Sequence, residues 1–507
     1  MYDNQIVINL SVISIAITYL LLFNLGSIIF ATYFGGDFQN IGGSLLTLTS
    51  KSRLFRVALG ASLAVAVVFS GVSTMSASAA QKAGAACKKE KAVVKGASAL
   101  DNLVCVKSKG KLVLEEQWKQ PATLSLLVFK TPNITEDYWV AMTAEARKLM
   151  PKLKIKYLYT PGLDRKAYAQ QLFSTNQLPD LIWDAPAGDF VKAGALLNYP
   201  EKALSFFNGG ETRIGGKIYG LPSGAQGIPM VYYNKTQFKD AGITSVPKTW
   251  AEFLTACEKL KAKNYTPLLA AGAGDAWASP IMLQGIMNSD VMGKNPKFNQ
   301  DLKSGKASLK ADALNAFKKF EVLTSKGYFN KDALSISYAQ VKEKFESGGG
   351  AMYPMGTWQA AGTGKDFEIG VFPIPPDSGA PTLGAVVSQV PFISAKTKYP
   401  AQALRAGIAI AGSQAGAEAG AVTDALFPNV KGWKAKAKMT QLFDESFAAY
   451  MATKRVPTFG WNGGEDELPA GFMTDLQKAA QGIMDGSKTA AAAVDELDAS
   501  IKKNTAR

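Results

Sequence analysis

The sequence predicts an α/β protein with more than one domain, and three observations support that prediction. The chain has 507 residues, which is enough for two or more compact units at about 100–200 residues each. Hydrophobic residues make up 47% of the chain and charged residues 19%, so global disorder is excluded. Residues 124–183 alternate short apolar runs with helical patterns, which is typical of a parallel sheet with crossover helices.

Two export-like patterns follow one another at the amino terminus. Residues 6–34 carry no charged side chain and are long enough to cross a bilayer. Lys51, Arg53 and Arg56 then precede an apolar run over residues 57–72 and small residues at 76–80, as in a secretory signal peptide. We interpret residues 51–79 as the signal peptide and residues 1–50 as a segment upstream of the true translation start; a membrane anchor is the alternative. The mature protein is therefore expected outside the cell or at its surface.

Histidine is absent, and cysteine is rare. The lack of histidine excludes Ser-His-Asp and Cys-His catalytic systems and HExxH-type zinc sites. Three cysteines are too few for a cysteine-only structural zinc site, so we expect no metal and no cofactor. In an exported chain, the short loop between Cys87 and Cys105 favours a disulfide that staples a small β module over residues 80–120. Cys257 shares an apolar helical face and is expected to be free and buried.

The charge balance is basic, with 56 Lys and Arg against 41 Asp and Glu and a formal net charge of +15. Such an excess can indicate nucleic acid, an anionic surface or only solubility. The lysines are spread along the chain, and no arginine-rich run is interleaved with aromatic residues. We therefore expect a solvated basic surface and no nucleic-acid partner.

The first elements after the small module follow from their patterns. Residues 124–129, 154–159 and 179–183 are predicted strands, and residues 138–149 and 165–173 are predicted helices. Ligands of such sheets lie beyond the carboxyl ends of the strands, which indicates the loops after Phe129 and Trp183. A strand is also predicted over residues 230–235. Thr249 and Glu252 have the spacing of a capping box at the start of a helix, and the glycines at 348–350 predict a helix end before another strand.

Several motifs then follow in a fixed order: Tyr219-Gly220-Leu221-Pro222, Tyr232-Tyr233-Asn234-Lys235, Thr249-Trp250 before Glu252-Phe253, Phe345-Glu346-Ser347-Gly348, Gly356-Thr357-Trp358 and Gly370–Pro375. Together they resemble the extracellular solute-binding proteins of ABC-type sugar importers, the relatives of maltose-binding protein. The resemblance covers about residues 121–500, and residues 80–120 lie outside it. It implies a two-lobed periplasmic-binding-protein-like fold with a ligand cleft between the lobes. It also implies a monomer without catalysis that binds a carbohydrate and meets the permease subunits of an importer.

The resemblance further implies that each lobe is discontinuous in sequence. The first lobe would comprise residues 121–231 and 378–430, and the second lobe residues 232–377 and 431–507. The chain would cross between the lobes near residues 231–234 and 377–383.

A sugar presents flat CH faces and a ring of hydroxyl groups, so its site needs aromatic platforms and planar hydrogen-bonding side chains. Trp183, Trp277 and Trp358 lie in loops after strand-like or glycine-rich stretches, away from periodic apolar faces, and Asp184 and Asp275 lie near two of them. The resemblance also implies a stacking tryptophan at Trp358 and a late cleft segment at Trp461 and Asn462. Gln226, before the strand over residues 230–235, and Gln389, in a later strand, complete the candidates. Ordinary core packing is the alternative for each tryptophan.

Two other functions remain open at this point. A carbohydrate-active enzyme would use paired carboxylates, although no two acidic residues stand on a recognisable frame. A basic cell-surface adhesin with a solute-binding core would use the lysine-rich segment 82–119.

Overall fold

The computed structural model describes residues 81–505, apart from residues 162–164, 212, 275, 462 and 470. The predicted signal peptide and the segment upstream of it lie outside the described residues, as do the candidates Asp275 and Asn462. The chain divides into units of residues 1–79 and 80–507, and the described residues all belong to the second unit. No helix within the described residues has the length and apolarity needed to cross a bilayer.

The amino-terminal module is a small antiparallel sheet held by a disulfide. Its strands are β1 (Val93–Val94), β2 (Leu103–Ser108) and β3 (Lys111–Glu116), in the order β1-β2-β3, followed by the 3₁₀ turn η3 (Gln117–Lys119). The turn η2 (Ala99–Asp101) precedes β2. The predicted disulfide between Cys87 and Cys105 is present, with a Cα–Cα distance of 5.9 Å. Lys109 and Gly110 adopt positive φ in the tight turn that joins β2 to β3 in an antiparallel hairpin.

The first lobe is built on a five-stranded sheet in the order β5-β4-β6-β15-β7. Its strands are β4 (Ala122–Val128), β5 (Leu153–Tyr159), β6 (Leu181–Ile182), β7 (Leu196–Leu197) and β15 (Phe392–Ser394). Strand β4 pairs in parallel with β5 and β6, as the sequence predicted, whereas β15 is antiparallel to both its neighbours. The helices of this lobe are α3 (Glu136–Met142), α4 (Ala144–Leu149), α5 (Arg165–Ser174), α6 (Ala187–Lys192), η4 (Glu201–Phe206), α14 (Pro400–Gly412) and α15 (Gln414–Asp424), and a short hairpin joins β8 (Arg213–Ile214) to β9 (Lys217–Ile218).

The second lobe surrounds a three-stranded antiparallel sheet in the order β12-β11-β13. Its strands are β11 (Met230–Asn234), β12 (Met352–Met355) and β13 (Ile369–Pro373). Its helices are α7 (Lys235–Asp240), α8 (Trp250–Ala262), α9 (Ile281–Met287), the π-helical η6 (Asn288–Met292), α10 (Phe298–Ser304), α11 (Leu309–Asp312), α12 (Leu314–Ser325), α13 (Tyr338–Glu346), α16 (Gln441–Ala452), α17 (Phe472–Met484) and α18 (Ala490–Thr505). Three 3₁₀ turns, η5 (Ala276–Ala278), η7 (Thr357–Ala361) and η8 (Gly464–Asp466), complete it.

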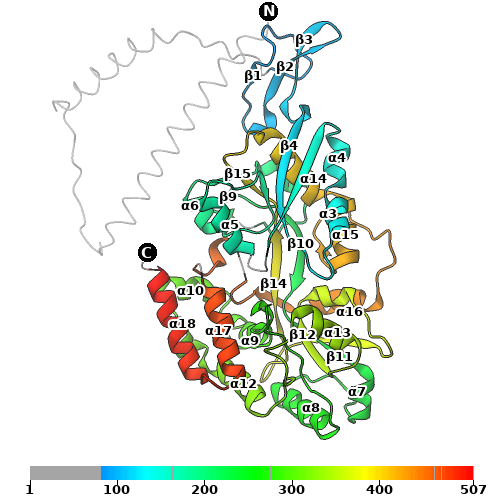
Figure 1. Cartoon of the computed structure of the whole chain (residues 1–507), viewed down its shortest axis with the longest axis vertical. Helices are drawn as coiled ribbons and strands as arrows, with labels where there is room; N and C mark the ends of the chain where they lie inside the picture. Colours follow the sequence, from blue (N-terminus) through cyan, green and yellow to red (C-terminus); the bar gives the residue numbers. More distant parts are fainter. Residues whose placement is uncertain are drawn as a thin grey trace, which may run out of the picture. The chain divides into compact units, whose positions relative to one another are not determined.

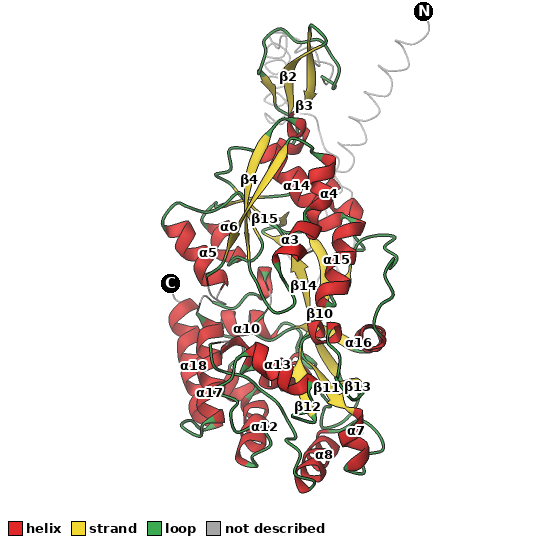
Figure 2. Cartoon of the chain, turned by 45° about the vertical axis from the view of Figure 1, so that its right-hand side comes forward, coloured by secondary structure: helices red, strands yellow, loops and turns green. Residues whose placement is uncertain are grey.

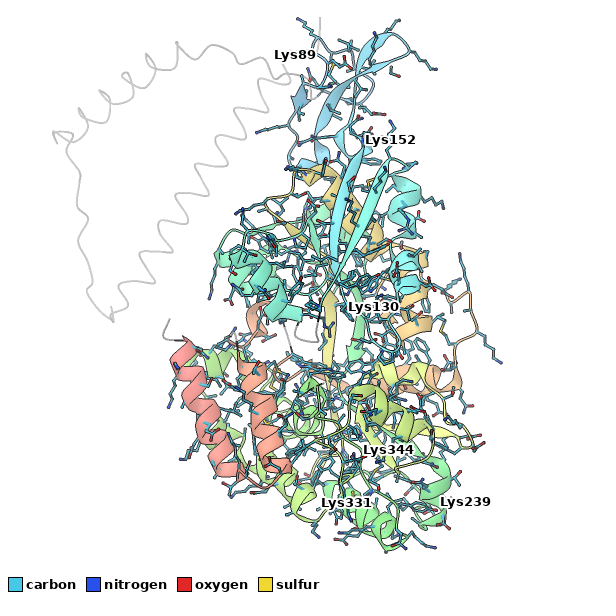
Figure 3. All side chains as sticks on the ribbon, viewed as in Figure 1. Lys89, Lys130, Lys152, Lys239, Lys331 and Lys344 are labelled. Carbon is cyan, nitrogen blue, oxygen red and sulfur yellow. A yellow bond between two sulfur atoms is a disulfide. The ribbon has the colours of Figure 1, made fainter. Side chains whose placement is uncertain are left out.

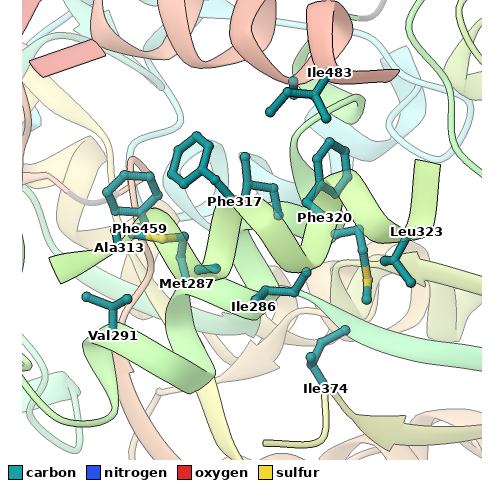
Figure 4. Packing of buried hydrophobic residues seen from close by; sticks show 14 of the residues in the cluster. Ile286, Met287, Val291, Ala313, Phe317, Phe320, Leu323, Ile374, Phe459 and Ile483 are labelled. Carbon is teal, nitrogen blue, oxygen red and sulfur yellow. The ribbon is translucent and has the colours of Figure 1, made fainter. Parts of the chain in front are cut away.

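The core of the second lobe lies where α9, α12 and α17 meet. Ile286, Phe317, Phe320 and Ile483 are all at most 2% exposed there (Figure 4). Helix α8 packs on the same core and begins with the predicted capping box, in which the Glu252 amide donates to Thr249 Oγ1 and the Thr249 amide donates to the Glu252 carboxylate. Cys257 of this helix is free and fully buried, as expected, and burial raises the pKa of its thiol.

A separate four-stranded sheet connects the two lobes, in the order β16-β10-β14-β17. Its strands are β10 (Pro222–Gly227), β14 (Thr382–Gln389), β16 (Phe427–Pro428) and β17 (Lys454–Pro457). Figures 1 and 2 show β10 and β14 running between the lobes. The crossing expected near residues 231–234 is therefore corrected to β10, because all of β11 pairs with β12 and β13 in the second lobe. The second expected crossing, at residues 377–383, leads into β14.

Candidate ligand-binding cleft

A cleft of about 500 Å³ is lined by residues of both lobes and of the connecting strands. The first lobe contributes side chains that follow the carboxyl ends of β4 and β6, where the sequence placed a site. The second lobe contributes η5, η7 and the loop before η8. The volume lies within the range of about 300–1,000 Å³ that is typical of small-molecule sites.

Three tryptophans form an aromatic wall on the second-lobe side of the cleft. The ring centroids of Trp277 and Trp358 are 6.0 Å apart, those of Trp277 and Trp461 5.9 Å, and those of Trp358 and Trp461 6.0 Å. Tyr338 extends the wall, with its ring centroid 5.0 Å from that of Trp277. All three indoles are only half-buried and line the cleft, so ring surface remains open to a ligand.

The local sequence around Trp358 explains its orientation. Trp358 lies on η7, two residues after Gly356, and its indole folds back over that glycine. A Cβ atom added to Gly356 would lie 2.1 Å from the ring, so only glycine permits this close approach. The Gly-Thr-Trp motif thus holds the indole at the cleft surface by backbone contact rather than by deep burial.

The opposite wall belongs to the first lobe and rests on a buried tryptophan. Trp139 is 0% exposed and packs edge-on against Phe129 and Trp183, with ring centroids 5.4 and 4.8 Å away. Its indole Nε1–H donates a hydrogen bond of 2.7 Å to the Phe129 carbonyl. Trp139 therefore fixes the positions of Phe129 and Trp183, which are two of the aromatic residues that this lobe presents to the cleft.

Arg165 lies beside this wall at the start of α5. Its guanidinium carbon is 3.9 Å from the centroid of the Phe129 ring, and its Nε is 3.7 Å from the Asp184 carboxylate. Stacking and the ion pair hold the guanidinium plane in one orientation, with both Arg165 and Asp184 in the cleft lining. The pair offers fixed donors and acceptors to a polar ligand.

Asp424, the last residue of α15, is the other carboxylate among the described residues that line the cleft. Asn133 Nδ2 and Gln226 Nε2 donate long hydrogen bonds of 3.4 Å to its two oxygens. Burial raises the pKa of Asp424 to about 7, although these two amides and the charge of Arg165 act in the opposite direction. A carboxyl group with weak partners and a costly charge gains from further donors, which ligand hydroxyl groups can supply.

A charged contact at the edge of the cleft links the two lobes. Lys166 Nζ of α5 is 2.7 Å from Glu467 Oε1, and the Gly188 amide of α6 donates to the other carboxylate oxygen at 3.1 Å. On the second-lobe side, Gln300 of α10 donates to Asp466 at 2.9 Å. Burial would lower the pKa of Lys166, but the charges of Glu467 and Asp184 outweigh that effect and raise it. The segment around η8 thus joins α5 and α6 to α10.

Every candidate site residue that the structure describes lies in the lining of this one cleft: Trp183, Asp184, Gln226, Trp277, Trp358, Gln389 and Trp461. Gln389 also donates to the Gly210 carbonyl at 3.0 Å, so its amide is partly engaged within the first lobe. Among the described residues, no cluster of three or more metal-ligating side chains is present.

The sequence did not single out Arg165, Tyr338 or Asp424. Arg165 and Tyr338 are the first residues of α5 and α13, and a position in a helix gave no sign of a role in the cleft. Asp424 ends an alanine- and glycine-rich helix, and only the tertiary fold places it opposite Gln226, about 200 residues earlier in the chain. No local pattern marks that contact.

Two α/β lobes, strands that cross between them and a cleft lined by both lobes define a two-lobed binding protein of the kind that closes on a ligand by hinge motion. The sequence profile of bacterial extracellular solute-binding proteins matches residues 131–407. The chain belongs to this family, as the motifs indicated.

Individual relatives agree with that membership. A multiple sugar-binding protein of Streptococcus mutans is 30% identical over 302 residues, which cover 53% of this chain and 69% of that protein. The solved structure of a chitin oligosaccharide binding protein superposes with a TM-score of 0.67 at 23% identity and covers 76% of this chain and 100% of its own. A structure of the solute-binding protein RafE with raffinose gives 0.59 at 20% identity, with coverage of 76% and 100%. These two structures support the fold, and the predicted two-lobed fold is confirmed.

Proposed function

We propose that the protein captures a mono- or oligosaccharide outside the cell and delivers it, without chemical change, to the permease subunits of an ABC-type importer. The observation that carries this proposal is the aromatic wall of Trp277, Trp358 and Trp461 in a cleft between two lobes. Half-exposed indole faces suit the CH faces of sugar rings better than they suit small charged solutes.

The polar lining supports the same ligand class. Arg165, Asp184, Gln226 and Asp424 are planar groups held by neighbouring side chains, and such groups can pair with adjacent hydroxyls of a sugar. A ligand held between the two walls would contact both lobes. Its binding energy would therefore favour the closed arrangement, which permease subunits could distinguish from the open one.

Relatives add independent support. The Streptococcus mutans relative is named as a multiple sugar-binding protein. One structural neighbour is named for binding a chitin oligosaccharide, and the other, RafE, was solved in complex with raffinose. These relatives bind different sugars but share the ligand class. We therefore propose a carbohydrate ligand without naming the individual sugar.

A thermal-shift screen of the protein lacking residues 1–79 tests the proposal. The panel comprises mono- to tetrasaccharides, with amino acids, short peptides and polyols as controls. A ligand at 100 times its Kd stabilises the folded state by about 2.7 kcal/mol, which raises the melting temperature by a few degrees. A shift with at least one sugar and none with the controls is expected. A shift with amino acids or peptides alone would overturn the proposal.

The proposal also includes two properties that the thermal-shift screen does not measure, namely that the protein does not cleave its ligand and that it is a monomer. Incubation of each binding sugar with the protein should return the sugar unchanged in chromatography. Cleavage that is lost in Asp184→Asn or Asp424→Asn would instead support the enzyme with paired carboxylates. Light scattering should give the mass of one chain with and without the sugar.

A further inference from the structure

We propose that the amino-terminal module holds the protein on a flexible polyanionic polymer through a cluster of lysines at its free end. This function is separate from sugar capture. The basic tip is defined as Lys88, Lys89, Lys91, Lys107, Lys109 and Lys111, and all six side chains are exposed. Figure 3 shows Lys89 at the end of the second unit that this module forms.

Covalent and backbone contacts gather these lysines. The Cys87–Cys105 disulfide straps residues 87–91 onto the hairpin of β2 and β3. The Cys87 amide donates to the Leu112 carbonyl at 3.1 Å, and the Lys91 amide donates to the Cys105 carbonyl at 2.8 Å. Lysines that are up to 23 positions apart in sequence are thereby brought to one end of the module.

The charges of the basic tip are not neutralised. No ion pair joins any of its six lysines to another described residue, and Glu90 is the acidic residue among them. The other acids of the module are engaged at its base: Asp101 pairs with Lys202, Glu116 with Lys119 at 3.0 Å, and Glu115 accepts a hydrogen bond from Gln120. Apart from Glu90, the module therefore separates its charges, with Asp101, Glu115 and Glu116 engaged at its base and the lysines without ion pairs at its tip.

The base of the module is attached to the first lobe. Gln402 of α14 donates to the Gln117 carbonyl at 3.0 Å, and the Arg405 guanidinium lies 5.0 Å from the centroid of the Trp118 ring. The segment precedes the matched family region at residues 131–407, and none of its residues lines the cleft. Attachment at the base leaves the basic tip free for a partner without obstructing sugar binding.

The shape of the basic tip favours a flexible polymer over a flat membrane. Lys107 stands opposite Leu112 in the register, on the face of the hairpin that also carries Cys105. Lys111 stands opposite Ser108 on the other face, and Lys109 lies in the turn between them. A flat surface would reach only part of this set, whereas a flexible chain can follow both faces. No aromatic side chain accompanies the basic tip to anchor it in a lipid interface.

Fluorescence anisotropy with fluorescein-labelled polyphosphate tests the proposal, using the protein lacking residues 1–79 at several salt concentrations. The tip variant carries Lys88→Gln, Lys89→Gln, Lys107→Gln and Lys111→Gln. The matched control variant carries Lys239→Gln, Lys318→Gln, Lys331→Gln and Lys502→Gln, which removes the same charge from exposed positions of the second lobe. Melting curves of all three proteins establish that they are folded.

The tip variant should lose affinity on the order of 100-fold at low salt, and the control variant less than about threefold. The slope of log Kd against log salt concentration should be smaller by about 3 in the tip variant. Each lysine contact with a single-stranded polyanion releases about 0.7 counterions, and the variant removes four lysines. Equal losses in both variants would overturn the proposal, because overall charge would then explain binding. Stronger tip-dependent binding to vesicles of equal phosphatidylglycerol and phosphatidylcholine than to polyphosphate would also overturn it in favour of a membrane.

Discussion

Replacement of Trp358 by alanine separates recognition from packing. Trp358 is half-buried, rests on Gly356 and contacts Trp277 and Trp461 across the cleft wall. If the indole is a sugar platform, its loss should weaken binding far more than it weakens folding.

The expected size follows from the area that stacking would bury. An aromatic side chain buries about 150–250 Å² in full, so one stacked face accounts for about 100 Å². At about 25 cal/mol per Å², that area corresponds to about 2.5 kcal/mol. We expect a loss of about 1–3 kcal/mol, which is about five- to 150-fold in Kd.

Calorimetric titration with a sugar from the screen measures the affinity, and ligand-free melting measures the stability. Trp250→Ala is the matched control, since Trp250 is 7% exposed in the core of the second lobe and outside the cleft lining. It should cost about 3–5 kcal/mol of stability and leave the affinity of the folded protein unchanged. Unchanged affinity together with a large loss of stability in Trp358→Ala would show that Trp358 is a packing residue.

Four further predictions concern charges and thiols. Sugar affinity should rise as the pH increases through about 7, because ligand hydroxyls donate best to the ionised carboxylate of Asp424, and Asp424→Asn should remove this dependence in calorimetry. Without ligand the sign is opposite: burial raises the pKa of Asp424, so the free energy of unfolding should fall as the pH rises from the ordinary carboxyl range to about 7, and less so in Asp424→Asn. Glu467→Gln breaks the 2.7 Å ion pair with Lys166 that joins the lobes and should weaken sugar binding severalfold with little change in melting temperature; an unchanged Kd would exclude a role in closure. Mass spectrometry after denaturing alkylation without reductant should find one modified thiol, that of Cys257, and three modified thiols would contradict the disulfide.

Local sequence patterns predicted much of the fold. Thr249 and Glu252 form the expected capping box, because its partners are three residues apart. The apolar run at residues 124–129 corresponds to β4, because a strand with parallel neighbours on both sides is buried and therefore apolar along its length. Trp183, Trp277 and Trp358 were also found locally, since they stand outside periodic apolar faces. The family resemblance, with its Gly356-Thr357-Trp358 motif, added support for Trp358 and indicated Trp461.

Features that depend on distant partners were not predictable in this way. The strand over residues 230–234 has the same local pattern whether it crosses between lobes or lies within one, and only its pairing with β12 and β13 places it in the second lobe. Asp424 and Gln226 are 198 positions apart in sequence, so no local pattern predicts the hydrogen bond between them. The location of the first crossing and the roles of Arg165 and Asp424 in the polar lining were therefore open until the tertiary contacts were known.

Binding of a sugar by the tryptophan wall is tested most directly by titrating the intrinsic fluorescence of the protein. Four of its eight tryptophans line the cleft, namely Trp183, Trp277, Trp358 and Trp461. A saturable spectral change with one sugar per chain is expected, and it should be largely lost when Trp277, Trp358 and Trp461 are all replaced by alanine in a protein that still folds. A wild-type spectrum that no sugar changes, or a sugar response that survives the triple replacement with the same Kd, would contradict a carbohydrate site in this cleft.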